Sequence, residues 1–147
     1  MTDNLTASAA LAAVPMFSRL SPEVLDALAD QTEERTFGVD DVVATEGAPN
    51  DGLLVLTSGV MEVRRGDRLI KVLGPGDSVG YLSLIDGGPH SVDVTVTQSG
   101  NGVFLAGVQF RVVIKNQPDV AISVMEVLAS HLRETLGWLD AADQPNS

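Results

Sequence analysis

The stretch from Asp51 to Asp77, DGLLVLTSGVMEVRRGDRLIKVLGPGD, decides the fold of this 147-residue chain. It contains three short runs, at 53–56, 60–65 and 68–73, in which apolar residues dominate or alternate with polar ones. Turn-forming residues follow each run, in the order Ser58-Gly59, Gly66-Asp67 and Gly74-Pro75-Gly76-Asp77. Runs of this length and spacing predict β-strands joined by tight turns, and Gly66-Asp67 predicts a two-residue hairpin loop.

Further strand-like segments lie on both sides of this stretch. Residues 42–44 form one short apolar run, and residues 92–97 alternate valine with aspartate and threonine, as in a half-buried strand. The Gly100-Asn101-Gly102 sequence predicts a turn that leads into a last strand at 103–105. We therefore expect a mainly β fold, an eight-stranded jelly-roll-like barrel (a double-stranded β-helix) between Arg35 and Leu105.

Helices are predicted on both sides of the barrel. Ser21 and Pro22 have the residue types of a helix N-cap and first turn, and Pro118 can start a long helix after a short one at 108–115. We expect one domain over residues 11–139, with flexible tails at 1–10 and 140–147.

The charge balance argues against two classes of partner. The chain has 20 acidic and nine basic residues, a net charge of −11, so we expect no binding to nucleic acid or to an anionic membrane surface. It has no cysteine and only two histidines, which excludes disulfides and thiolate ligands and argues against a metal site. We expect a cytoplasmic protein without a metal or other cofactor.

The last helix carries an apolar heptad pattern. Its members recur at spacings of three and four residues: Ile122, Met125, Ala129, Leu132, Leu136 and Leu139. Such a stripe can pack on the barrel or on the same helix of a second chain. We expect the second arrangement, a homodimer through this helix.

The order of these elements, together with several short motifs, resembles the cyclic-nucleotide-binding domain family, and in particular the sensor domain of catabolite-activator-type regulators. The resemblance extends from about Leu11 to Leu139. The matching motifs are Phe17 with Leu20-Ser21, Glu46-Gly47, the segment 51–63, the segment 73–80, Phe110 and Pro118. The resemblance implies the barrel fold described above, and a dimer contact through the last helix.

The resemblance also implies a phosphate-binding cassette over residues 79–94, VGYLSLIDGGPHSVDV. The family has a glutamate for the ribose 2′-hydroxyl directly after the glycine, where this chain has Tyr81. It has an arginine for the cyclic phosphate directly after the proline, where this chain has His90. The cassette is therefore degenerate, and its candidate ligand-binding residues are Gly80, Tyr81, Leu82, Ser83, His90 and Ser91.

Two functional readings follow from the sequence. The first is a non-catalytic regulatory or interaction module with a protein partner, in which binding of cAMP and cGMP is weak or lost. The alternative is a stand-alone sensor that binds a cyclic nucleotide or another anionic small molecule through a rewired pocket. We expect no enzyme, because no nucleophile–base pair or catalytic carboxylate pair is evident, and no winged-helix domain, because only eight residues follow Leu139.

Overall fold

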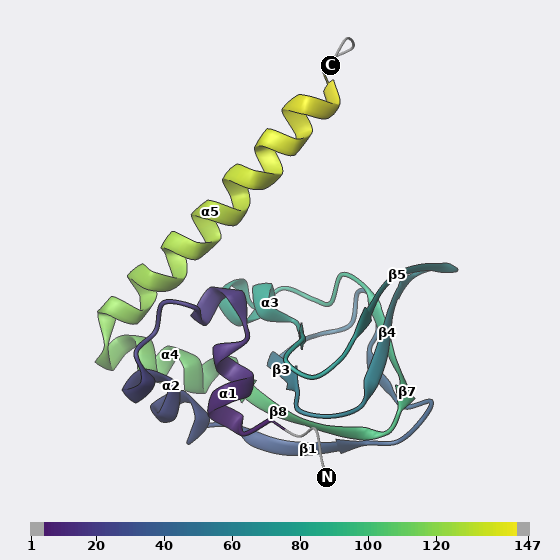
Figure 1. Ribbon diagram of the computed structural model, residues 1–147, viewed down its shortest axis with the longest axis horizontal. Helices are drawn as coiled ribbons and strands as arrows, with labels where there is room; N and C mark the ends of the chain where they lie inside the picture. Colours follow the sequence, from purple (N-terminus) through teal and green to yellow (C-terminus); the bar gives the residue numbers. More distant parts are fainter. Residues whose placement is uncertain (1–4, 144–147) are drawn as a thin grey trace.

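The computed structural model describes residues 5–143 (Figure 1). Three short helical segments come first: α1 (Ala7–Ala12), the 3₁₀ turn η1 (Pro15–Phe17) and α2 (Pro22–Ala29). Eight strands follow, with one helix inserted among them: β1 (Glu33–Phe37), β2 (Val42–Ala44), β3 (Gly52–Leu56), β4 (Val60–Arg65), β5 (Arg68–Leu73), β6 (Ser78–Val79), α3 (Tyr81–Asp86), β7 (Asp93–Gln98) and β8 (Gly100–Ala106). Two helices complete the described chain: α4 (Gly107–Asn116) and α5 (Pro118–Asp143).

The strands form two antiparallel four-stranded sheets, in the orders β1-β8-β3-β6 and β2-β7-β4-β5. This is the mainly β jelly roll with flanking helices that the sequence predicts. The hairpin between β4 and β5 is also confirmed, since Arg65 pairs with Arg68 and Gly66 has φ 61° in the two-residue loop. Ser21 caps α2, because its side chain accepts the backbone N–H of Val24 at 3.3 Å.

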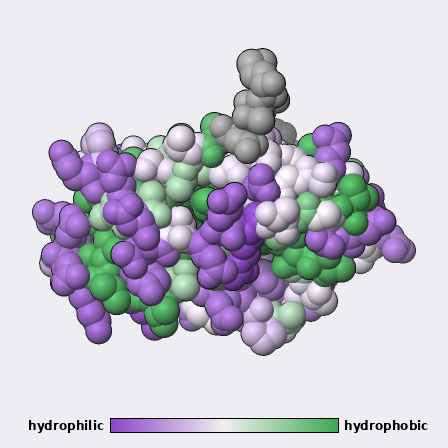
Figure 2. All heavy atoms as spheres, turned by 90° about the horizontal axis from the view of Figure 1, so that it is seen from below, coloured by the Kyte–Doolittle hydropathy of each residue, from purple (hydrophilic) through white to green (hydrophobic). Residues whose placement is uncertain are grey.

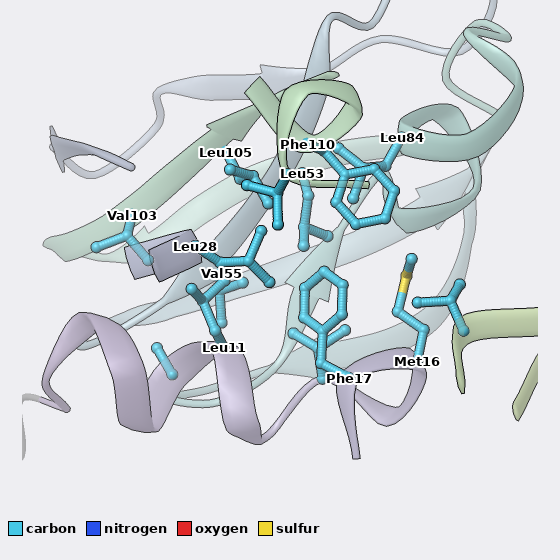
Figure 3. Packing of buried hydrophobic residues seen from close by; sticks show 14 of the residues in the cluster. Leu11, Met16, Phe17, Leu28, Leu53, Val55, Leu84, Val103, Leu105 and Phe110 are labelled. Carbon is cyan, nitrogen blue, oxygen red and sulfur yellow. The ribbon is translucent and has the colours of Figure 1, made fainter. Parts of the chain in front are cut away.

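Two hydrophobic clusters share the strands β3 and β8. On β3, alternate residues point to opposite faces, so Leu53 and Val55 belong to the first cluster and Leu54 and Leu56 to the second. The first cluster lies between one sheet and the helices, where the Phe17 and Phe110 rings are 5.9 Å apart (Figure 3). The second cluster fills the space between the two sheets.

The boundaries of both predicted tails are wrong. Residues 7–12 form α1, which is capped by the Thr6 hydroxyl and places Ala10 and Leu11 in the first cluster with no exposed surface. At the other end, α5 continues through the Asp140-Ala141-Ala142 segment to Asp143. The remaining parts of the predicted tails, 1–4 and 144–147, lie outside the described residues.

The turn predicted at residues 100–102 is also wrong, because these residues begin β8 and pair with β1. Their glycines serve close backbone approach instead. A side chain at Gly100 would collide with the backbone of Ser58 and Gly59, and one at Gly102 would lie 2.9 Å from the Val55 carbonyl oxygen. Glycine inside a strand often has this role.

The surface is mixed in character. Figure 2 shows one face of the molecule, on which hydrophilic residues surround separate hydrophobic patches. Several apolar side chains of β5 and α5 are among the exposed residues, including Leu69, Val72 and Leu132. In Figure 1, α5 extends away from the body of the domain, and the β4–β5 hairpin projects at another edge.

The first cluster gives a direct stability test. Leu105→Ala removes a side chain with no exposed surface and should lower the free energy of unfolding by about 2–5 kcal/mol. The matched control is Leu69→Ala, also in a strand but 45% exposed, which should cost less than about 1 kcal/mol. Urea unfolding at one protein concentration measures both values. Equal losses would contradict the assignment of Leu105 to the core.

Candidate functional site

The cassette begins at a sharp change of chain direction between β6 and α3. Gly80 makes this change with φ 88°, in the left-handed region that favours glycine. A side chain here would also collide with the amide nitrogen of Asn50 and would approach the Gly52 carbonyl oxygen to 2.8 Å. Both the backbone angle and the close packing therefore require glycine at position 80. Gly87, with φ 70°, ends α3 in the same left-handed conformation.

A cavity of about 230 Å³ lies along the cassette. All six residues proposed from the sequence line it: Gly80, Tyr81, Leu82, Ser83, His90 and Ser91. The two sequence segments that carry them, 80–83 and 90–91, are thus brought together by α3 and the loop after it. Their role in ligand binding stays a prediction.

His90 is held by its backbone rather than by its side chain. Its N–H donates to the Ala48 carbonyl at 3.0 Å, and its carbonyl accepts from the Gly47 N–H at 2.8 Å. Burial lowers the pKa of the His90 imidazole below its ordinary value of 6.5. Asp93, the acidic residue nearest in sequence, accepts the Glu46 N–H instead at 2.8 Å. His90 is therefore mainly neutral at pH 7 and does not reproduce the fixed positive charge of an arginine.

Tyr81 stands at the first position of α3, at the junction of two cavities. Besides the cassette cavity, it lines a second one together with Lys71 and His131. The phenol has one hydroxyl where the family places a carboxylate, so it is a weaker acceptor for a ribose hydroxyl. Its side chain is 37% exposed, which places it at the surface of the site rather than in the core.

Asn50 is a feature of the site that the sequence analysis missed. Its Oδ1 accepts the Gly52 N–H at 3.1 Å, which fixes the side-chain amide. Its Nδ2 packs against Gly80 and is the buried side-chain polar atom without a hydrogen-bond partner among the described residues. No sequence pattern indicates this contact, because it joins the loop before β3 to the turn before α3.

Comparison with known proteins identifies the class to which this fold and cassette belong. The profile of the cyclic nucleotide-binding domain family matches residues 34–117. The chain is therefore a member of the cyclic nucleotide-binding domain family, of the catabolite-activator type, and has the fold of its regulatory domains.

Two curated relatives illustrate the range of proteins that contain such a domain. The chain is 29% identical over 130 residues to a CRP-like cAMP-activated global transcriptional regulator of Mycobacterium tuberculosis, which covers 85% of this chain and 58% of the regulator. It is 29% identical over 111 residues to a cyclic nucleotide-gated potassium channel of Mesorhizobium japonicum, covering 76% of this chain and 31% of the channel. The chain thus spans less than two thirds of the length of either relative.

Solved structures agree with this assignment. The N-terminal domain of a transcriptional regulator from Streptomyces coelicolor A3(2) superposes with a TM-score of 0.82 at 28% identity, covering 88% of this chain and 94% of that one. The Thermus thermophilus catabolite activator protein superposes with a TM-score of 0.73 at 26% identity, covering 87% and 62%.

The part of the chain that the structure describes contains neither a metal-binding cluster nor a membrane-spanning helix. In this part of the chain, histidine, aspartate and glutamate residues nowhere gather in a group of three that could hold a metal ion. Within the same residues, every helix is too short or too polar to span a lipid bilayer.

The environment of His90 predicts its titration. Because burial favours the neutral imidazole, the folded-state midpoint should lie below 6.5 and should return toward 6.5 in urea. The unfolded chain binds the proton more readily, so the contribution of His90 to stability is complete above pH 6.5 and declines as the pH falls below it. Proton NMR of the imidazole measures the midpoint, with His131→Gln used to assign the two histidines. A folded-state midpoint above 6.5 would contradict the proposed neutral state.

Proposed function

We propose that this chain is a non-catalytic regulatory module that acts through self-association of α5 and a protein partner, with weakened binding of cAMP and cGMP. Its relatives support a regulatory role, since they are named as a cAMP-activated transcriptional regulator and a cyclic nucleotide-gated channel. The observation that carries the proposal is the exposed apolar face of α5.

The two faces of α5 have different environments. Val120 and Val124 are buried in the cluster between the helices and one sheet, and Val127 is buried as well, at 2–7% exposure for the three. The heptad residues lie on another face and are 51–59% exposed at four positions, namely Ile122, Met125, Leu132 and Leu136. Ala129 is exposed as well, whereas the side chain of Leu139 lies outside the described residues. This distribution favours a second helix, rather than the barrel, as the partner of the stripe.

One polar contact links the first half of α5 to the N-terminal segment and does not involve the stripe. Arg19 Nη1 donates to Glu126 Oε2 at 2.9 Å and so ties α5 to the segment between η1 and α2. Both side chains are more than half exposed, so this ion pair contributes little to the stability of the fold. The heptad stripe is then presented to solvent as one continuous edge, which suits pairing with a second copy of this chain.

A charge substitution in the stripe tests the dimer. Burial of each leucine in a helix pair contributes about 1.5–3 kcal/mol, so Leu132→Glu with Leu136→Glu should convert a dimer into a folded monomer. The matched control places the same two charges outside the stripe, with Ser130→Glu and Gly137→Glu, and should stay dimeric. Light scattering after size exclusion gives the masses. A native chain that is monomeric at high concentration would contradict this part of the proposal.

The cassette chemistry supports weak binding of cyclic nucleotides. The cyclic phosphate carries a fixed negative charge, and burying it without a charged partner is costly. Backbone N–H groups around Gly80 and the hydroxyls of Ser83 and Ser91 remain available as neutral donors. They do not replace both the carboxylate and the guanidinium that the family uses at positions 81 and 90.

Restoring those two groups should restore binding. Each charged hydrogen bond contributes about 1.5–3 kcal/mol, so Tyr81→Glu with His90→Arg should tighten cAMP binding by at least about a hundredfold. Calorimetry with cAMP and cGMP on the native and double-variant proteins measures this change. Submicromolar affinity of the native protein at pH 8, where His90 is neutral, would contradict the proposal.

The second candidate function is a sensor of an anionic small molecule through a rewired pocket. It is favoured by the second cavity that Tyr81 lines, in which Lys71 supplies a positive charge outside the cassette. In either case we propose no catalytic role and no bound cofactor, since the cassette brings together donors for an anion and no nucleophile with a base. The net charge of −11 argues for a protein rather than a nucleic acid as partner.

A further inference from the structure

A second cavity of about 220 Å³ lies where four separate parts of the chain meet. The four residues that represent these parts are Met16 of η1, Lys71 of β5, Tyr81 of α3 and His131 of α5. Asp77, in the loop between β5 and β6, and Ser78, the first residue of β6, also line the cavity. It is separate from the cassette cavity, and Tyr81 and the segment around β6 lie between the two.

The register of the β4–β5 hairpin places Lys71 toward this cavity. Lys71 pairs with Val63, and Leu73 pairs with Met61, so all four side chains lie on the same face of the sheet. Val63, Met61 and Leu73 are buried in the cluster between the sheets, which identifies this face as the inner one. Lys71 is thus an exposed positive charge on the same face of β5 as the buried Leu73, two residues before it.

This charge lacks a carboxylate partner within the described residues. Ion pairs there involve Arg19, Arg35 and Arg64, whereas Lys71 has no acidic atom within 4 Å. Asp77 is the acidic residue lining the cavity, and its Oδ2 accepts the Gly74 N–H at 2.9 Å. Lys71 is an exposed cation that lines the cavity and belongs to none of these ion pairs, so its ammonium group can pair with an external anion.

His131 supplies a second nitrogen donor from the opposite wall. It lies on α5, two residues beyond Ala129 and outside the exposed heptad stripe, and it is half-buried. The cavity and the proposed dimer contact therefore use different faces of the same helix. The Tyr81 hydroxyl is a third donor, and Met16 and Pro15 give the cavity an apolar wall.

We propose that this cavity binds a small anion, with a carboxylate or phosphate group held by Lys71 and His131 and assisted by the Tyr81 hydroxyl. The ligand would bridge β5 and α5, and its charge partner would be Lys71 of β5 instead of a cassette residue. The proposal rests on the second candidate function given above, a sensor of an anionic small molecule, and it specifies the binding site of that sensor. It does not require α5 to dimerise.

The test uses two probes, sodium phosphate and sodium succinate, each compared with sodium chloride at equal ionic strength. Amide shifts in ¹H–¹⁵N spectra of the full chain report binding at each residue. We expect saturable shifts at Lys71, Tyr81 and His131 with at least one probe. The probe that acts at the lower concentration distinguishes a phosphate from a carboxylate site. Absence of saturable shifts with both probes would overturn the proposal, as would shifts confined to Ser83, His90 and Ser91.

Substitutions then assign the donors. Lys71→Met should weaken binding about tenfold or more, Lys71→Arg should retain most of it, and His131→Gln should weaken it by a smaller factor. The matched control is Arg68→Met, which removes an exposed cation from the same strand outside the cavity. An equal loss in Arg68→Met and Lys71→Met would show a general charge effect and overturn the proposal.

Failure of this proposal is distinguishable from failure of the regulatory one. The shift measurement is repeated on the Leu132→Glu, Leu136→Glu variant, whose changes lie on the other face of α5. Retained binding in that variant supports a site within one chain, whatever the mass of the native protein. Loss of binding in a folded monomer would overturn a site built from Lys71 and His131 of the same chain.

Discussion

The antiparallel pairing of β3 with β8 is the constraint on which the rest of the structure depends. Both strands have one face toward the helical cluster and one toward the space between the sheets. Successive residues of each strand therefore belong to the two clusters in turn. Leu53 and Leu105 are direct partners and face the helices, whereas Leu54 and Phe104 are direct partners and face the second sheet. A slip of one residue in this pairing would exchange the two cores. The other edge of β3 pairs with β6, which leads directly into the cassette.

Local sequence patterns predict most of this fold because the residues that form its turns and helix starts can be recognised in the sequence. The Gly66-Asp67 loop, the cap at Ser21 and the helix start at Pro118 each depend on a few neighbouring residues. They can therefore be predicted without any tertiary information. The glycines at 100 and 102 led to a wrong prediction of a turn, because their role depends on distant parts of the chain. Their role depends on the backbone of Ser58 and Val55, more than 40 residues away in sequence, and looks like a turn when considered alone. The alanine-rich α1 was missed because a helix of six residues is too short to be stable alone, although Thr6 caps it. Burial of Ala10 and Leu11 adds the missing stability only in the folded domain.

The candidate site likewise has one part that the sequence predicts and another part that depends on tertiary contacts. Its place in the chain could be predicted, since the resemblance implies a cassette over residues 79–94, and the structure brings its six candidate residues to one cavity. Its side-chain environment could not. The contact of Asn50 with Gly80, and the meeting of Lys71 with His131 in one cavity, join parts of the chain that only the completed barrel brings together. The substitutions at Tyr81 and His90 therefore change the chemistry of the site while leaving its framework intact.

The length of α5 has a mechanical consequence. At 1.5 Å per residue, its 26 residues form a rod about 39 Å long, and the valines that anchor it lie in its first half. A rod held near one end is a lever. A rotation of about 10° around Val124 would displace the end at Asp143 by roughly 5 Å, since about 28 Å of helix lies between them. An adjustment of less than 1 Å near Arg19 and Glu126 could thus be amplified several-fold at the far end of the helix.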